Sequence, residues 1–407
     1  MKDFTVPELL SPAGDMARLK AAVHFGADAV YLAGKTMGMR SAPDNFSPEE
    51  LIEAVRFCHS RGVKVYLTCN TLPSCDDVDG LDAFFEAAGA AGVDALIVAD
   101  IGVFFAAMRR LPDVALHVST QAGVFNQLTA REFFAMGAKR VVLARELSLD
   151  EISRIRDETP PELEIETFVH GAMCVSFSGR CLLSNYLAGR ERDSNRGNCA
   201  QPCRWSYTLT EEKRPDEHYP IIEEDRGTYI LNAKDLCMIE HLDKLARAGI
   251  DSFKIEGRAK SEYYTAVATN AYRSALDQLR RDPDNYAPEQ WIIDETLKIS
   301  HREYCTGFYF GQPDNVQRTH GHIRDYAVVA RAVSQENGLL RCTELNRFSK
   351  GDEVELLRRG EPPLPFTVGM MFDADMQPIE VARHPEMTVF LADVPPMEPG
   401  AMIRKKI

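Results

Sequence analysis

A short unit recurs along the first two thirds of the chain: a glycine, one further residue, an Asp or a Lys, and then a run of apolar residues. It occurs at Gly26 before "AVYLAG", Gly62 before "VYLTCN", Gly92 before "ALIVAD", Gly137 before "RVVLARE" and Gly249 before "SFKIEGR". Each glycine follows apolar residues spaced three or four apart, which is typical of a helix that ends at glycine. The apolar runs are short and rich in β-branched residues, so the unit predicts a helix followed by a buried strand.

The number of predicted strands reaches eight when three further runs are added, "ELLSPAG", "ALHVSTQAG" and "LEIETFVHG". Eight strands alternating with helices over residues 1–280 fit the length of a TIM-type (β/α)8 barrel, roughly 250 residues. We therefore predict this barrel. A doubly wound open sheet is the alternative, because alternation alone does not establish that a sheet closes.

Two further regions interrupt or follow the predicted barrel. A Cys-rich insertion at about 171–230 separates the seventh strand, 163–170, from the eighth, 251–256, and is far longer than an ordinary loop. Residues 281–325, rich in Pro, Asp and Asn at their start, are predicted to be a connector. Short alternating runs with turn signals over residues 326–407 predict a small C-terminal β-barrel domain.

The composition of the 407-residue chain excludes a membrane-embedded role. No run approaches the roughly 18 apolar residues that a membrane span requires, and the N-terminus lacks an apolar signal core. We therefore expect a cytoplasmic protein whose thiols are reduced. The net charge of −14 argues against a broad nucleic-acid-coating surface, although a local basic patch can still bind RNA.

Five of the ten cysteines fall between residues 174 and 237. They lie in a polar, glycine-rich setting that suits burial as small hydrophobic residues poorly, and they are Cys174, Cys181, Cys199, Cys203 and Cys237. Clustered thiolates are preferred ligands of zinc and of iron–sulfur clusters. The spacing leaves both metals open, as well as a set of reduced thiols without metal.

Catalytic groups of a TIM barrel collect where the strands end at its C-terminal face. Arg145, Glu256 and Arg258 each end a run too apolar to solvate a charge without a reason, and they are candidate catalytic residues together with His170. Candidates for binding an anionic substrate are Arg40, Asn70, Gln121 and Lys254. For each residue a structural ion pair or hydrogen bond is the alternative.

The insertion is also rich in arginine, interleaved with Tyr186 and Trp205. Its candidate RNA-binding residues are Arg190, Arg192, Arg196 and Arg204. Arginine combined with aromatic rings can pair with phosphates and stack on bases, and a solvated loop is the alternative.

Several longer segments carry a family resemblance. They are "ELLSPAGDMARLKAAVHFGADAVYLAG", "VSTQAGVFN", "VVLARELSLDEI", "FVHGAMCVSFSGRCLLSNYLAGR", "NRGNCAQPCRW" and "DSFKIEGRAKS". Through them the chain resembles the collagenase-like peptidases of unassigned catalytic type. It is most similar to the branch that hydroxylates the wobble uridine of tRNA at carbon 5 with prephenate. One barrel followed by one small β domain supports that branch.

The resemblance implies an enzyme that hydroxylates tRNA and carries a 4Fe-4S cluster. By position, the implied ligands are Cys174, Cys181, Cys199 and Cys203, with Cys237 as the alternative ligand. Prephenate is the expected hydroxyl-donating co-substrate. The expected partners are the tRNA anticodon loop and either a second copy of the chain or another family member.

Two other functions remain open from the sequence. A peptidase could use Cys174 as the nucleophile and His170, four residues earlier, as its base. A non-catalytic iron–sulfur scaffold of a hydroxylation complex would carry the cluster without activity of its own.

Overall fold

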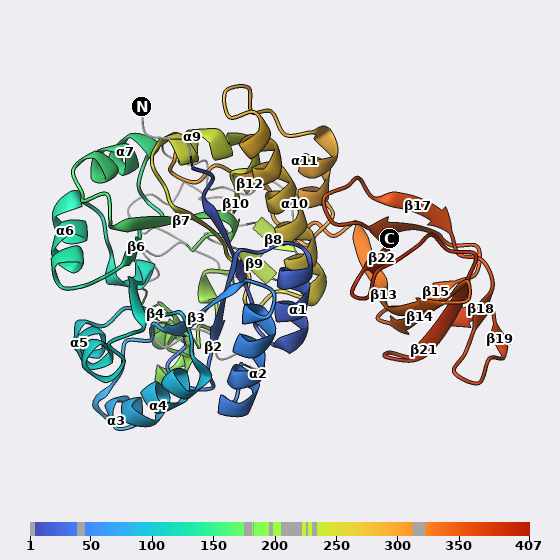
Figure 1. Ribbon diagram of the computed structural model, residues 1–407, viewed down its shortest axis with the longest axis horizontal. Helices are drawn as coiled ribbons and strands as arrows, with labels where there is room; N and C mark the ends of the chain where they lie inside the picture. The colour runs from blue at the N-terminus through green and yellow to red at the C-terminus, as the bar shows by residue number, and fades with distance from the viewer. Residues whose placement is uncertain are drawn as a thin grey trace.

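The predicted strands close into a barrel. The structure is a computed structural model that describes residues 5–38, 45–174, 181, 183–194, 198–204, 222–224, 227–229, 234–311 and 322–407. Eight parallel strands form the barrel (Figure 1): β1 (Glu8–Pro12), β2 (Ala29–Ala33), β3 (Lys64–Cys69), β4 (Ala95–Val98), β5 (Ala115–Val118), β6 (Arg140–Val142), β7 (Glu164–Ala172) and β11 (Ser252–Ile255). Strand β11 pairs with both β1 and β7, which completes the circle and excludes the open-sheet alternative.

Helices surround this barrel in the predicted alternation. They are α1 (Met16–His24), α2 (Pro48–His59), α3 (Cys75–Val78), α4 (Leu81–Ala91), α5 (Ile101–Arg110), α6 (Gln127–Ala135), α7 (Leu149–Asp157), α9 (Leu242–Arg247) and α10 (Glu262–Arg281). The five glycines of the recurring unit all have positive φ angles, from 71° to 104°. Each one therefore ends its helix in the left-handed region, as the sequence predicts.

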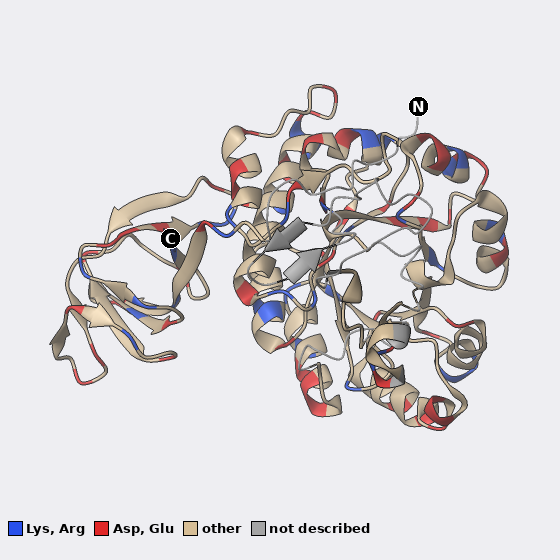
Figure 2. Cartoon of the chain, turned by 180° about the vertical axis from the view of Figure 1, so that it is seen from behind, with Lys and Arg blue, Asp and Glu red and all other residues tan. Residues whose placement is uncertain are grey.

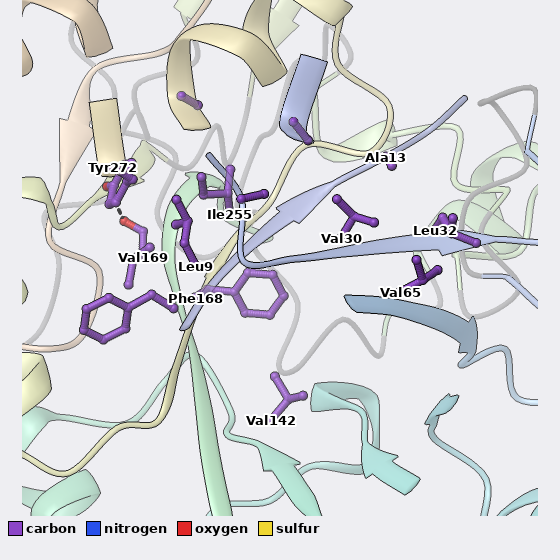
Figure 3. Close-up of a cluster of buried hydrophobic side chains, with 14 of the residues drawn as sticks. Leu9, Ala13, Val30, Leu32, Val65, Val142, Phe168, Val169, Ile255 and Tyr272 are labelled. Carbon is purple, nitrogen blue, oxygen red and sulfur yellow. Dashed lines mark hydrogen bonds between the residues drawn. The ribbon is translucent and has the colours of Figure 1, made fainter. Parts of the chain in front are cut away.

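The main hydrophobic core lies between the outer faces of the strands and the helices. Leu9, Val30, Leu32, Val65 and Ile255 belong to this core and are fully or almost fully buried (Figure 3). Because side chains alternate along a strand, their neighbours point into the barrel. A smaller apolar cluster there contains Leu10, Ala29, Tyr31, Tyr66, Ala95 and Ile97.

Charged side chains fill much of the remaining barrel interior. Arg140 donates to Glu8 at 2.7 Å, to Glu164 at 2.8 Å and to Glu166 at 3.0 Å. Glu166 has no solvent exposure and also accepts a hydrogen bond from Lys254 at 2.8 Å. TIM barrels are usually filled by branched apolar residues, so this ion-pair network is a special feature of the chain.

The insertion follows β7 and returns to the barrel at its end. Its described elements are α8 (Leu183–Ala188), the hairpin of β8 (Ile222–Glu224) and β9 (Gly227–Tyr229), and β10 (Asp235–Cys237). Strand β10 pairs antiparallel with the end of β7, at Asp235–Ala172 and Cys237–His170. After α10, the segment predicted to be a connector contains α11 (Gln290–Leu297) and β12 (Tyr304–Cys305), which pairs with β10.

The C-terminal domain is an antiparallel half-barrel. Its main sheet has the order β17-β16-β22-β13-β14-β21-β18-β19. Its strands are β13 (Tyr326–Glu336), β14 (Leu339–Glu344), β15 (Phe348–Ser349), β16 (Glu353–Leu357), β17 (Leu364–Thr367), β18 (Met371–Phe372), β19 (Pro378–Ile379), β20 (Val381–Ala382), β21 (Thr388–Ala392) and β22 (Met402–Lys406). Strands β15 and β20 form a separate pair, and one face of the main sheet encloses the domain's own core.

Buried charges join this domain to the barrel. Arg404 of β22 is fully buried and donates to Glu295 of α11 at 2.7 Å and to Glu355 of β16 at 2.8 Å. Lys298 donates to the same Glu355 carboxylate at 2.9 Å. The C-terminal domain is therefore seated against α10 and α11 (Figure 1). In the described residues, no helix is both long enough and apolar enough to cross a membrane.

Candidate active site at the barrel mouth

Two cationic side chains at the mouth of the barrel lie near one aromatic ring. The guanidinium carbon of Arg145, just after β6, lies 3.8 Å from the centroid of the Phe168 ring on β7. The Lys254 ammonium on β11 lies 5.4 Å from the same centroid. Both distances fall in the range of cation–π contacts. The fold thus brings two of the predicted site residues together through a third, Phe168, which the sequence did not single out.

Arg145 is held in place without being neutralised. Its Nη1 donates to the backbone carbonyl of Ala172 at 2.9 Å, and its planar group stacks on Phe168. Within the part of the chain that the structure describes, Arg145 makes no ion pair with a carboxylate. A half-buried guanidinium that no described carboxylate pairs with can bind a carboxylate or a phosphate through two parallel hydrogen bonds.

Lys254 has a different environment. It is 5% exposed, its ammonium lies 4.5 Å from the centroid of the Tyr31 ring, and its charge is balanced by Glu166. Burial lowers the pKa of Lys254, while the Glu166 carboxylate acts in the opposite direction. The structure therefore places this predicted substrate-binding residue inside the ion-pair network.

Arg258 follows β11, and its side chain extends to β3. It is 3% exposed and donates from Nη1 to the Thr68 hydroxyl on β3 at 2.9 Å. Its backbone also comes very close to Gly14, where an added Cβ would lie 2.2 Å from the Arg258 carbonyl oxygen. Gly14, after β1, is therefore required for the Arg258 loop to pack on the rim.

The other predicted strand-end residues lie at the ends of their strands. Glu256 follows β11, and its backbone carbonyl accepts a hydrogen bond from the Tyr264 hydroxyl at 3.1 Å. Asn70 follows β3 and is half-buried. Gln121 is buried in the 3-10 turn Thr120–Ala122 after β5, and its backbone amide donates to the Ser119 hydroxyl at 3.3 Å. Arg40 lies outside the described residues.

His170 is enclosed by tyrosines. Its ring is 1% exposed and packs near the rings of Tyr264, Tyr272 and Tyr304, with centroid separations of 5.3 to 5.9 Å. Burial lowers its pKa to about 3, so the ring is neutral. Nδ1 lies 3.4 Å from the Tyr272 hydroxyl, and Nε2 is buried without a hydrogen-bond partner among the described residues. The structure therefore assigns His170 a packed position against α10 (Figure 3 shows Tyr272 bonded to Val169).

The five clustered thiols differ in exposure. Cys174 is exposed, whereas Cys181, Cys199, Cys203 and Cys237 are half-buried. Backbone amides donate to two of the sulfurs, to Cys181 from Leu183 at 3.4 Å and to Cys199 from Gln201 at 3.3 Å. Such hydrogen bonds stabilise a thiolate, so the chemistry of these donors suits a soft metal.

The positions of the thiols do not yet form a metal site. In the described residues, no three Cys, His, Asp or Glu side chains lie close enough together to hold a metal ion. Cys237 has a different environment from the other four cysteines of the cluster. Its sulfur is 3.8 Å from the Tyr272 hydroxyl, and burial raises the pKa of its thiol. The donor set has the right chemistry, but the described geometry does not fit a cluster.

The structure describes only part of the predicted RNA-binding group. Arg192 is exposed at the end of the 3-10 turn Arg190–Arg192, and its carbonyl accepts a hydrogen bond from the Ser184 hydroxyl. The side chains of Arg190 and Arg204 and the whole of Arg196 lie outside the described part. Acidic and basic residues are interspersed over the outer helices (Figure 2).

The ion-pair network of Glu166, Arg140 and Lys254 was not predicted from the sequence, because its members lie on separate strands. A signal was present: polar residues alternate at Glu164 and Glu166 and again at Ser252 and Lys254. A period of two places each pair on one face of its strand. In a parallel strand that is buried on both faces, charges at this spacing indicate an ionic barrel interior.

Comparisons with known proteins match both the barrel and the C-terminal domain of the chain. The profile of peptidase family U32 matches residues 14–319, and that of the peptidase family U32 C-terminal domain matches residues 324–404. The chain is 37% identical to "tRNA hydroxylation protein P1" of Bacillus subtilis over 98% of this chain and 94% of that protein. It is 33% identical to "tRNA hydroxylation protein P" of Escherichia coli over 95% and 93% of the two chains. It is also 45% identical to "Uncharacterized protease MJ0090" of Methanocaldococcus jannaschii, over 74% and 73%.

Proposed function

This chain belongs to peptidase family U32, and we propose that it is an RNA-hydroxylating member that modifies carbon 5 of the wobble uridine in tRNA. The observation that carries the proposal is the similarity to two relatives named as tRNA hydroxylation proteins. It spans both domains of this chain and nearly all of each relative. The proposal therefore covers the whole molecule, barrel and C-terminal half-barrel together.

The mouth supplies a binding site for an anionic co-substrate. Arg145 presents a guanidinium without a described counter-ion, and Phe168 fixes the plane of that group. We propose that Arg145 binds one carboxylate of prephenate and that Arg258, after β11, orients the second. The charge of Lys254 is balanced by Glu166. In this proposal Lys254 therefore contacts the Phe168 ring and does not bind the anion directly.

A 4Fe-4S cluster on Cys174, Cys181, Cys199 and Cys203, with Cys237 as the alternative ligand, remains a proposal. It is supported by the chemistry of the thiols, two of which receive backbone hydrogen bonds. The insertion would have to bring the sulfurs closer together than the described positions do. Such a cluster would supply electron transfer when bound.

The peptidase alternative requires a base that activates a nucleophile within hydrogen-bond reach. Cys174 is exposed, while His170 is buried among tyrosines. Neither ring nitrogen of His170 bonds to the Cys174 thiol, because Nδ1 faces Tyr272 and Nε2 has no hydrogen-bond partner in the part of the chain that the structure describes. The pair therefore does not form the nucleophile and base that the sequence suggested.

The test is made in cells whose own tRNA uridine hydroxylation has been deleted. Expression of this chain should restore 5-hydroxyuridine or its derivatives in tRNA, measured by mass spectrometry of nucleosides. Anaerobically purified protein should contain about four irons and an equal amount of acid-labile sulfide.

A Cys174→Ala variant separates the two parts of the proposal. It should lose both the iron and the modification, whereas a Cys75→Ala variant, which changes an exposed thiol outside the insertion, should keep both. Wild-type protein that restores no modified uridine would overturn the proposed function. A Cys174→Ala variant that still hydroxylates tRNA would remove the cluster from it.

A further inference from the structure

We propose that the outer face of the C-terminal sheet, at Arg341, Phe372 and Phe390, is a platform on which unpaired bases of the RNA substrate stack. The inference rests on the proposed function and assigns a binding surface to it. The occupant that fits this surface is a single-stranded RNA loop, which offers unstacked bases next to phosphates.

The alternation of side chains shows which face is outward. On strands β14, β18 and β21, the residues that enter the domain core are Leu340, Cys342, Met371, Val389 and Leu391. Arg341, Phe372 and Phe390 occupy the positions between or beside them, so they point to the opposite face. Arg341 is exposed, and both phenylalanines are half-buried, so part of each side chain reaches solvent.

The strand register places these three residues in one row. Arg341 of β14 pairs with Phe390 of β21, and Phe390 pairs with Phe372 of β18. Directly opposed residues in an antiparallel pair have their Cβ atoms about 5 Å apart. One guanidinium and two aromatic rings therefore follow one another across three neighbouring strands.

The row is available for a ligand. The Arg341 guanidinium makes no ion pair or hydrogen bond with any residue that the structure describes. The acid next to Phe372 is Asp373, whose carboxylate accepts hydrogen bonds from the Asp375 and Gln377 amides in its own turn. The positive charge of Arg341 is thus free to meet a phosphate.

The same face continues to the rim of the barrel. In the adjacent row, Arg331 of β13 pairs with Thr343, and Thr343 pairs with Thr388. The Arg331 guanidinium donates to both carboxylate oxygens of Glu262, at 2.7 and 2.8 Å. Glu262 is the first residue of α10, which follows the C-terminal end of β11 and so lies on the mouth side of the barrel.

The other half of this face is covered. Strands β16, β22 and β13 carry Glu355, Arg404 and Val328, which contact the barrel domain. The row of Arg341, Phe390 and Phe372 therefore lies next to the surface that contacts the barrel domain, on the side away from the mouth. A uridine that enters the mouth must leave the base stack of its loop, and neighbouring bases then need another surface on which to stack.

The experiment measures binding of a fluorescent anticodon stem-loop with uridine at the wobble position to the full-length protein. A Phe372→Ala/Phe390→Ala double variant should bind at least about fivefold more weakly, as expected when a stacked base loses its ring. Phe390→Trp should keep wild-type affinity, whereas Phe390→Leu should not. Arg341→Ala should reduce the slope of log affinity against log salt by about 0.7, the contribution of one phosphate contact.

Matched controls are Phe105→Ala, at a ring 36% exposed on α5, and Arg383→Ala, at an exposed arginine after β20. Both should bind like wild type, and all variants should keep the wild-type unfolding midpoint. If wild-type protein hydroxylates tRNA but the row variants bind like the controls, only this inference is overturned. Wild-type RNA affinity in Phe390→Leu would also overturn the inference, because an aromatic ring would then not be required for binding. If the wild-type protein does not hydroxylate tRNA, the proposed function itself is refuted.

Discussion

The Phe168 ring decides where the barrel mouth keeps an uncompensated cation. Among the described residues, Arg145 stacks on this ring and bonds only to a backbone carbonyl, whereas Lys254, near the same ring, is paired with Glu166. Arg145, predicted to be catalytic, and Lys254, predicted to bind substrate, therefore differ in charge balance. The difference comes from their partners, because burial is tolerated only where a charge is compensated or used.

Arg145 should be more sensitive to substitution than its exposure suggests. Arg145→Ala is expected to lower wobble-uridine hydroxylation about tenfold or more at limiting prephenate, because it removes a charged hydrogen-bond donor. Arg145→Lys should rescue only part of the activity, since Lys cannot form a planar bidentate contact. Nucleoside mass spectrometry measures the effect. Arg154→Ala, at an exposed arginine on α7, is the control, and equal activity of the two alanine variants would contradict the assignment.

Glu166 should be a main determinant of stability. Glu166→Gln removes the charge that compensates both Arg140 and Lys254 in the barrel interior. The expected loss is about 3–5 kcal/mol in the free energy of unfolding, measured by urea denaturation. Glu158→Gln, which changes an exposed carboxylate paired with Arg154, should leave the free energy unchanged. A small effect at Glu166 would show that the interior charges do not depend on it.

At the scale of elements, the recurring glycine separates every helix of the repeat from the strand that follows. The prediction of these boundaries is confirmed because it depends on local chemistry alone: a left-handed residue ends the helix, and an apolar run begins the strand. The same glycines differ in what surrounds them. An added Cβ at Gly62 would meet nothing within 4 Å, whereas at Gly249 it would lie 2.5 Å from the Arg156 side chain.

The difference in surroundings between Gly62 and Gly249 can be tested with a matched pair of alanine variants. Gly62→Ala should cost only the left-handed backbone conformation, about 1–2 kcal/mol. Gly249→Ala should cost about 1–3 kcal/mol more, because the Arg156 side chain must move from its bond to the Leu163 carbonyl. Thermal and urea unfolding of the two variants provide the comparison. Equal losses would mean that Arg156 adapts freely.

At the scale of the whole molecule, a buried ionic contact fixes the half-barrel on the barrel. Burial alone would raise the pKa of Glu355, but hydrogen bonds and charge from Lys298 and Arg404 outweigh it, so the pKa is lowered. A carboxylate with a depressed pKa stabilises the folded state above its unfolded pKa, about 4.3. That stability is lost as the pH falls through the folded pKa.

Domain docking should therefore weaken in acid. We expect the C-terminal domain to unfold in a separate, earlier calorimetric transition as the pH falls below about 4.3, while the two domains unfold together near neutral pH. In Glu355→Gln the separate transition should already be present at neutral pH, with less dependence on pH. Thr367→Val, at an exposed residue of β17, is the control, and pH-independent docking in wild type would contradict the prediction.

Local patterns along the chain were enough to predict the barrel, its eight strands and the positions where strand ends could carry chemistry. Helical spacing, closing glycines and short apolar runs are local patterns, so they can be read without knowing what packs against them. The metal ligands, the co-substrate and the RNA-binding arginines stay predictions.

The division of the candidate residues between the site and the scaffold depends on contacts that form when the chain folds. Lys254 meets Glu166 from 88 positions earlier in the chain, and His170 meets tyrosines about a hundred positions later. The row at Arg341, Phe390 and Phe372 likewise exists only in the register of three strands. Such partners are distant in sequence, and a side chain's charge, exposure and freedom to bind depend on the partners that the fold brings to it.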